Sequence, residues 1–356
     1  MRKLASIKII NDIRPIEGRD RIELAIVDGW SVIVKKNEFN IGDKCIYIEI
    51  DSVLPEKPEF EFLRSKNFRI KTMKMAGVIS QGICFPLSFL PAGEYEVGQD
   101  ITELMGITQY NATMDVEPVV PKKTKWPRWL MRYKWFRKMV LPTKREHKGF
   151  PTFISKTDET RIQNMPFILE NKNPWVATEK IDGQSGTFCL VRNKSKIPFV
   201  KDKFEFIVCS RNLRIYHSDN SSYWSVARRY ELENVLKNMI GSRDWIAIQG
   251  ECVAPNVQGN KYKVSEPDLY VFNLIYPTGR LPSEMAKRLC EARGLKFVPI
   301  LDNGFILPDT VEETLKYAHG QSQIGDTLRE GSVFRSQDGK KSFKAVDPLF
   351  LIHYDE

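Results

Sequence analysis

The sequence predicts an α+β protein with a small β-barrel at its N-terminus and a larger domain of antiparallel sheets with flanking helices. Short alternating or β-branched segments fill the first 110 residues, whereas strand-like and helical segments are interleaved from Phe150 onward. A stretch rich in proline, basic and aromatic residues separates these regions. We therefore expect domains at residues 1–110 and 150–356, joined by a linker at residues 111–149, since 356 residues suffice for two cores.

The expected barrel consists of short strands separated by turn residues such as Asp28, Gly29 and Gly42. The strands are Leu4 to Ile10, Arg21 to Val27, Trp30 to Lys35 and Cys45 to Ile50, with a further pair at Phe68 to Met75 and Gly77 to Phe85. Short strands this close together predict a small barrel, and the OB-fold is the commonest such barrel among nucleic-acid binders. The pattern alone leaves other small barrels open.

The linker holds the chain's excess of positive over negative charge. Residues 122–148 contain eleven Lys or Arg and one acid, so they account for the net charge of +9. Three of the seven tryptophans also fall here. One interpretation is an electrostatic and stacking contact with nucleic acid. The other is an interdomain helix over Trp129 to Val140, bounded by prolines, whose aromatic side chains pack while its cations are solvated. Both remain open.

The larger domain is expected to be α+β. The strands are Pro174 to Thr178, Ser185 to Arg192, Phe204 to Ser210, Trp245 to Cys252, Leu269 to Tyr276, Gly331 to Ser336 and Lys341 to Val346. The helices are Ser222 to Met239, Ser283 to Arg293 and Val311 to Ala318. Gly294 suits the C-terminal cap of the second helix.

Composition argues against several classes of protein. No apolar run approaches the ~20 residues of a membrane span, and the N-terminus lacks the apolar core of an export signal. The six cysteines are scattered without a C-x-x-C pair, which argues against structural zinc and suits a reducing, intracellular compartment. Nothing in the sequence implies a membrane or a stable protein partner.

The chemistry centres on Thr178-Glu179-Lys180-Ile181-Asp182-Gly183, which contains K-x-D-G. This motif alone is weak, and a charged turn would explain it. Its weight comes from the ordered segments that follow, each at the end of or on an expected strand. They are Ser210-Arg211-Asn212, Gln249-Gly250-Glu251, Tyr270-Val271-Phe272-Asn273, Glu330-Gly331-Ser332-Val333-Phe334-Arg335 and Ser342-Phe343-Lys344-Ala345.

This order resembles the covalent nucleotidyltransferase superfamily of ATP-dependent ligases and capping enzymes. The first segment is similar to motif I of RNA ligases, and the others to motifs Ia, III, IIIa, IV and V. The resemblance extends from Lys156 to the C-terminus. The segment Phe153 to Asn164 is similar to the lead-in of one clade, the Deinococcus- and Naegleria-type RNA ligases. That clade carries an OB domain before the ligase domain, in agreement with the strand-rich first region.

The resemblance implies a role for each matching residue. Lys180 is the nucleophile that takes AMP from ATP as a lysyl-AMP phosphoramidate, which requires a deprotonated amine. Asp182, Glu251 and Glu330 hold Mg²⁺ or Mn²⁺ through its waters, as suits a hard cation. Lys344 contacts the α-phosphate. The full expected set of catalytic and ATP-binding residues is Lys180, Lys344, Glu179, Arg161, Arg211, Phe272 with Tyr270 as its substitute, Glu251 and Lys341.

One position departs from the family. RNA ligases commonly have Lys-x-Lys in motif V, and Ser342 occupies the first place here. Either Lys341 substitutes through a one-residue displacement, or one phosphate contact is lost.

The sequence therefore predicts an ATP-dependent RNA ligase that joins 3′-OH and 5′-phosphate ends, in particular nicks in a duplex whose 3′-OH strand is RNA. DNA ligases and capping enzymes place an OB domain after motif V, and only twelve residues follow Lys344. Two alternatives remain: a DNA or mixed-substrate nick ligase, and a non-catalytic RNA-binding protein on a ligase scaffold. The intact lysine and its carboxylates argue against the second.

Overall fold

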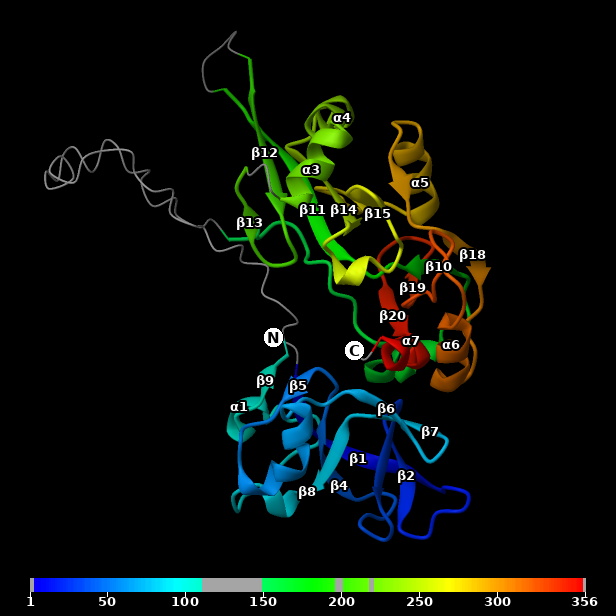
Figure 1. The fold of residues 1–356 in the computed structure, drawn as a ribbon. Coiled ribbons are helices and arrows are strands. Elements are labelled where there is room, and N and C mark those ends of the chain that lie inside the picture. The colour runs from blue at the N-terminus through cyan, green and yellow to red at the C-terminus, as the bar shows by residue number, and fades with distance from the viewer. Residues whose placement is uncertain (1–2, 111–148, 196–200, 218–220, 355–356) are drawn as a thin grey trace, which may run out of the picture.

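The computed structural model describes residues 3–110, 149–195, 201–217 and 221–354 (Figure 1). We refer to residues 3–110 as the N-terminal part and to residues 149–354 as the C-terminal part. The basic block at residues 122–148, with the helix considered for Trp129 to Val140, lies outside the described residues.

The N-terminal part is built around one long strand that serves two partners. The sheet has the order β3-β2-β1-β4-β8, formed by β1 (Ala5–Pro15), β2 (Ile22–Val27), β3 (Trp30–Lys35), β4 (Lys44–Ile48) and β8 (Ile83–Pro86). The first half of β1 pairs with β4 and the second half with β2, with a register shift between Ile10 and Asp12. Such an irregularity bends a strand, which allows the sheet to curl into the expected barrel.

Smaller elements complete the N-terminal part. They are β5 (Ser52–Val53), which pairs with β9 (Thr108–Gln109), β6 (Thr72–Met75), which pairs with β7 (Val78–Gln81), the 3-10 helices η1 (Pro58–Lys66) and η2 (Leu87–Phe89), and the short α1 (Thr102–Met105). The single strand expected at Gly77 to Phe85 is wrong, because it divides at Gly82. Gly82 has φ +98°, and a Cβ there would lie 2.7 Å from the carbonyl oxygen of Ile48.

The C-terminal part contains two antiparallel sheets. One has the order β18-β10-β19-β20, formed by β10 (Trp175–Lys180), β18 (Ile300–Phe305), β19 (Gly331–Ser336) and β20 (Ser342–Val346). The other has the order β13-β12-β11-β14-β15-β16, formed by β11 (Gln184–Asn193), β12 (Lys203–Cys209), β13 (Arg214–Ile215), β14 (Trp245–Val253), β15 (Asp268–Tyr276) and β16 (Gly279–Arg280), with β17 (Lys296–Phe297) parallel to β15. The short η4 (Ile162–Asn164) and η5 (Pro166–Glu170) precede β10, and η6 (Gln258–Asn260) lies between β14 and β15.

Helices cover the outer faces of these sheets (Figure 1). The helices α3 (Ser222–Arg229), α4 (Leu232–Met239) and α5 (Ser283–Glu291) share a core with the larger sheet, and α6 (Val311–Ala318) shares one with the smaller. The continuous helix expected at Ser222 to Met239 is wrong. It breaks at Glu231, whose φ of 46° is left-handed, so that each half buries its own apolar face.

The two parts share a core and a set of hydrogen bonds. The last helix, α7 (Pro348–His353), places Phe350 and Leu351 in the hydrophobic core of the N-terminal part. The indole nitrogen of Trp30 donates to Asn164 over 2.8 Å, and the Asn164 amide donates to Glu49 over 2.8 Å. The lead-in segment and α7 therefore anchor the N-terminal part beside the ligase sheets.

The cysteines behave as expected for small buried groups, since all six are buried and unpaired. Among the described helices, none combines the length and apolar character needed to cross a bilayer.

Candidate active site

The start of β19 places two of the expected site residues side by side. Lys180, the last residue of β10, lies opposite Gly331, the first residue of β19. Gly331 has φ +154°, and a Cβ there would lie 2.2 Å from the carbonyl oxygen of Ala345. Only glycine fits this crowded position, which explains the Glu-Gly sequence of the motif. As a result, the preceding Glu330 carboxylate forms an ion pair with the Lys180 ammonium.

The carboxylates around Lys180 control its charge. Burial alone would lower the pKa of Lys180, but Glu330 and Glu251, with Asp182 behind them, raise its pKa above the usual value. In the ligand-free protein the Lys180 side chain is therefore an ammonium ion at neutral pH.

Glu251 comes from the neighbouring sheet. It lies in β14 opposite Ser185 of β11, whose hydroxyl is 3.4 Å from its carboxylate. Gly183 keeps this approach open, because a Cβ there would lie 2.6 Å from the carbonyl oxygen of Cys252 and 3.0 Å from Cγ of Glu251. Burial raises the pKa of Glu251 to about 8; Lys180 opposes this, and the carboxylates of Glu330 and Asp182 add to it.

Asp182 is held by two consecutive residues of the loop after β14. The Tyr262 hydroxyl accepts a hydrogen bond from the Asp182 backbone N–H over 2.8 Å, and the Lys261 ammonium is ion-paired with its carboxylate. Lys261 and Tyr262 belong to no motif recognised in the sequence. Their role follows only from the fold, which brings the loop against the turn after the nucleophile.

The three carboxylates fit a divalent cation. Their mutual repulsion is visible in the raised pKa of Glu251, and a doubly charged ion would relieve it. No three acidic, thiol or imidazole groups of the described residues lie close enough to form a direct ligand cage. This arrangement suits an ion bound partly through its waters.

A second cluster gathers cations at the end of β20. Lys344 Nζ lies 2.9 Å from Asp158, whose other oxygen lies 2.6 Å from Arg211. Arg161 joins them, because its backbone bridges that of Lys344. Burial lowers the pKa of Lys344 to about 8, assisted by Arg161 and opposed by Asp158. Three of the expected phosphate contacts therefore lie together.

Lys341 lies apart from this cluster. It is exposed and precedes the first residue of β20, and its backbone N–H donates to the Ser336 hydroxyl over 2.9 Å. The place beside Ser342 belongs instead to Arg280, whose guanidinium donates to the Ser342 hydroxyl over 3.0 Å. The displacement considered for Lys341 stays a prediction, with Arg280 as a second cation beside Ser342. Arg280 was missed because the two-residue β16 carries no motif.

The remaining expected residues line the neighbouring strands. Phe272 and Tyr270 are both half-buried on β15, Phe272 at the register shift of that strand, and the Arg335 guanidinium is 5.8 Å from the Phe272 ring centroid. The Glu179 carboxylate accepts hydrogen bonds from Ser322 and from the backbone of Gln323. Its own N–H donates to the carbonyl of Pro299, so its contact with the purine stays a prediction.

Comparisons with known proteins agree with this arrangement. Residues 4–87 match an OB-fold domain family and residues 173–346 match the RNA ligase family. The solved structure of Naegleria gruberi RNA ligase with PPi aligns at a TM-score of 0.82, with 32% identity over 100% of both chains.

Two mutants of the same enzyme are also similar. One, with ATP and Mn, has a TM-score of 0.81 and 31% identity over 100% of both chains; another, with AMP and Mn, has 0.80 and 31% over 99% of both. A search of curated proteins finds no match. The resemblance and the fold class inferred from the sequence are confirmed: the chain belongs to the RNA ligase family, as an ATP-dependent ligase with an OB-fold domain ahead of its ligase domain.

Proposed function

We propose that this enzyme seals RNA through lysyl-AMP and an adenylylated 5′ end, using ATP and Mg²⁺ or Mn²⁺. The observation that carries the proposal is the placement of Lys180 among three carboxylates. The similar Naegleria structures hold ATP or AMP with Mn, which supports the same ligands here.

In the first step Lys180 Nζ attacks the α-phosphorus of ATP. A nitrogen–phosphorus bond forms, the bond to pyrophosphate breaks, and the proton leaves Nζ. Glu330 is the nearest acceptor for that proton, since it is already paired with Lys180. Asp182, Glu251 and Glu330 would hold a divalent ion, whose charge would lower the pKa of Lys180 and stabilise the reacting phosphate.

The cations of the second cluster match the charge on the nucleotide. Lys344 contacts the α-phosphate, and Arg161 and Arg211 contact the outgoing pyrophosphate or the RNA phosphate. Phe272 stacks on adenine, with Tyr270 as the alternative. We keep Glu179 beside the purine. We assign Lys341 an outer contact with the phosphates, because it is exposed and lies before β20.

The later steps act on polynucleotide. A 5′-phosphate oxygen displaces Lys180 from AMP, and the 3′-OH then attacks the adenylylated phosphate and releases AMP. We propose a nicked duplex with an RNA 3′-OH strand as the substrate. We assign residues 1–110 and the linker at 111–149 to polynucleotide binding, and residues 150–356 to catalysis.

Label transfer from α-labelled ATP tests this function. The wild-type enzyme should become labelled and release pyrophosphate, and Lys180→Ala should remain unlabelled. Lys172→Ala is the matched control, because Lys172 pairs with Asp309 on the surface. Label on Lys180→Ala would refute the assignment of the nucleophile.

Matched nicks then test the substrate. A nick with an RNA 3′ terminus should be sealed much faster than an all-DNA nick, since a protein senses the 2′-OH and the A-like helix. Equal rates on both would identify a DNA or mixed-substrate ligase instead.

A further inference from the structure

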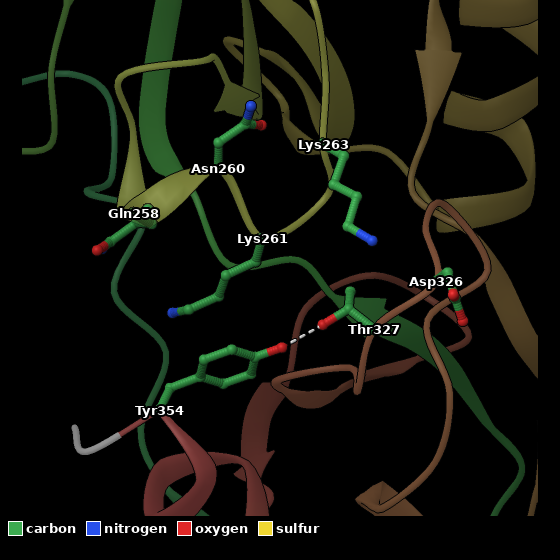
Figure 2. Close-up of a pocket in the computed structure, with 8 residues that line it drawn as sticks. Gln258, Asn260, Lys261, Lys263, Asp326, Thr327 and Tyr354 are labelled. Carbon is green, nitrogen blue, oxygen red and sulfur yellow. Dashed lines mark hydrogen bonds between the residues drawn. The ribbon is translucent and has the colours of Figure 1, made fainter.

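A polar pocket of about 570 Å³ lies beside the nucleophile turn. One wall is the loop after β14, and the other is formed by the segment before Glu330 and by the end of the chain (Figure 2). The lining residues are Gln258, Gly259, Asn260, Lys261, Lys263, Asp326, Thr327 and Tyr354.

The loop that forms the first wall is held in a strained conformation. Gln258, Asn260 and Lys263 have φ of 46°, 50° and 52°, in the left-handed region that side chains rarely adopt. The Asn260 side chain fixes the loop, because its oxygen accepts from Val264 N–H over 2.9 Å and its amide donates to the Val264 carbonyl over 3.0 Å. Strain of this kind persists where the surroundings impose it, and it clusters at ligand sites.

The same loop is tied directly to catalysis. Its Tyr262 and Lys261 hold the backbone and the carboxylate of Asp182, two residues after the nucleophile. The Lys261 ammonium also lies 4.6 Å from the ring centroid of Tyr354, whose hydroxyl is hydrogen-bonded to Thr327 (Figure 2). A ligand in the pocket would therefore touch the groups that set the position of Asp182.

Three exposed polar side chains of the pocket, Lys263, Gln258 and Asp326, make no ion pair or side-chain hydrogen bond within the described residues. Lys263 is exposed, and no carboxylate of the described residues lies within ion-pair distance of it. Gln258 is exposed too, and within the described part of the chain its amide makes no side-chain hydrogen bond. Figure 2 shows Gln258 on one side of the pocket and Lys263 on the other. The lining thus offers a cation and an amide at separate points, and the Asp326 carboxylate adds an acceptor for a hydroxyl.

We propose that this pocket binds the ribose–phosphate backbone of the RNA strand being joined, with Lys263 on a phosphate and Gln258 on a ribose 2′-OH. The pairing of a cation with an amide suits a phosphate flanked by a hydroxyl that both donates and accepts. The ATP phosphates have their own cluster at Lys344, and that cluster shares no residue with this lining. The inference rests on the proposed function, because it takes the joined polymer to be RNA.

Separate assays of the ATP and RNA steps test the pocket. Lys263→Ala should be labelled by ATP at the wild-type rate. Its sealing of a pre-adenylated RNA nick, at subsaturating nick, should fall roughly tenfold, and the slope of nick affinity against salt should drop by about one. Gln258→Ala should lose several-fold of the preference for a ribose over a deoxyribose in the 3′-OH strand. Lys287→Ala on α5 is the charge-matched control and should behave as wild type.

The outcomes separate this inference from the proposed function. Wild-type sealing and salt slope in Lys263→Ala, with an unchanged sugar preference in Gln258→Ala, would overturn the pocket assignment. Equal losses in labelling and sealing would also overturn it, because the pocket would then serve the ATP step. A wild-type enzyme that takes no label from ATP would refute the proposed function, whereas weaker RNA binding by Lys263→Ala in a direct affinity measurement would still support the pocket.

Discussion

The ammonium of Lys180 is ion-paired with the carboxylate of Glu330 where β10 and β19 meet, and this pair holds the nucleophile in its unreactive form. The register that opposes Lys180 to Gly331 makes the contact unavoidable. The resting enzyme thus keeps a charged lysine among acids. We therefore expect Lys180 to become reactive when a bound cation takes over the charge that the lysine supplies to the carboxylates.

Replacement of Glu330 should make Lys180 reactive at lower pH in the metal-free enzyme. Glu330→Gln removes the largest influence that raises the pKa of Lys180, so the neutral amine forms at lower pH. The measurement is the rate of acylation of Lys180 against pH in EDTA, followed by mass spectrometry. The same midpoint in Glu330→Gln and wild type would contradict the role of the pair.

The charge on Lys344 should limit catalysis at alkaline pH. Its pKa is lowered to about 8, below that of an ordinary lysine, so the cation is lost as pH rises through that value. The groups that face it are Asp158, Arg161 and Lys180. For adenylylation, kcat/KM for ATP, which reports the free enzyme, should therefore decline above about pH 8.

Two variants test whether Lys344 causes the alkaline decline. Lys344→Arg keeps its charge at every pH tested and should abolish the alkaline decline, whatever its maximal rate. Asp158→Asn removes the anion that raises the pKa of Lys344, so the decline should move to lower pH. If the alkaline decline of kcat/KM stays at the same pH in both variants, the decline belongs to a group other than Lys344.

The sequence indicated the candidate reacting residues, but not the residues that hold them in place. The residues that react lie in motifs at strand ends, where the order along the chain is enough to recognise them. Lys261 and Arg280 were not recognised, because each acts from a loop or a two-residue strand that only tertiary packing brings to Asp182 or Ser342.

In the fold, too, features with a local sequence pattern were predicted, and features that depend on distant packing were not. The central strands follow from their apolar patterns, which local sequence reveals. The break at Glu231 was missed because apolar periodicity continues through it and both halves pack on one sheet. The helix α7 was missed because its apolar face is buried against a distant part of the chain.

Gly331→Ala should destabilise the protein and uncouple Glu330 from Lys180. The added Cβ would meet the Ala345 carbonyl at 2.2 Å with φ at +154°, so β19 must shift. We expect a loss of about 2–3 kcal/mol in the free energy of unfolding by urea. Gly304→Ala in β18 is the control, because its Cβ would have 4.0 Å of clearance, and it should leave stability nearly unchanged. Equal stability of the two variants would contradict the steric argument.

The basic block should act on RNA and spare the ATP step. Deletion of residues 1–110 cannot test this cleanly, since it would uncover Phe350 and Leu351, which lie in the N-terminal core. Charge removal avoids that problem, so the variant is Lys134→Ala, Arg137→Ala and Lys138→Ala combined.

The triple variant should keep wild-type labelling by ATP, bind nicks more weakly and lose about one unit of salt slope for each phosphate contact removed. Nick affinity is measured across a salt series, with urea unfolding of both proteins alongside. Unchanged affinity and slope would identify the block's charges as solvated. A loss of labelling together with a lower unfolding midpoint would mean that the segment stabilises the fold, with its positive charge incidental. The salt slope distinguishes RNA binding from the other two outcomes, because it reports the counterions that are released where protein cations contact phosphates.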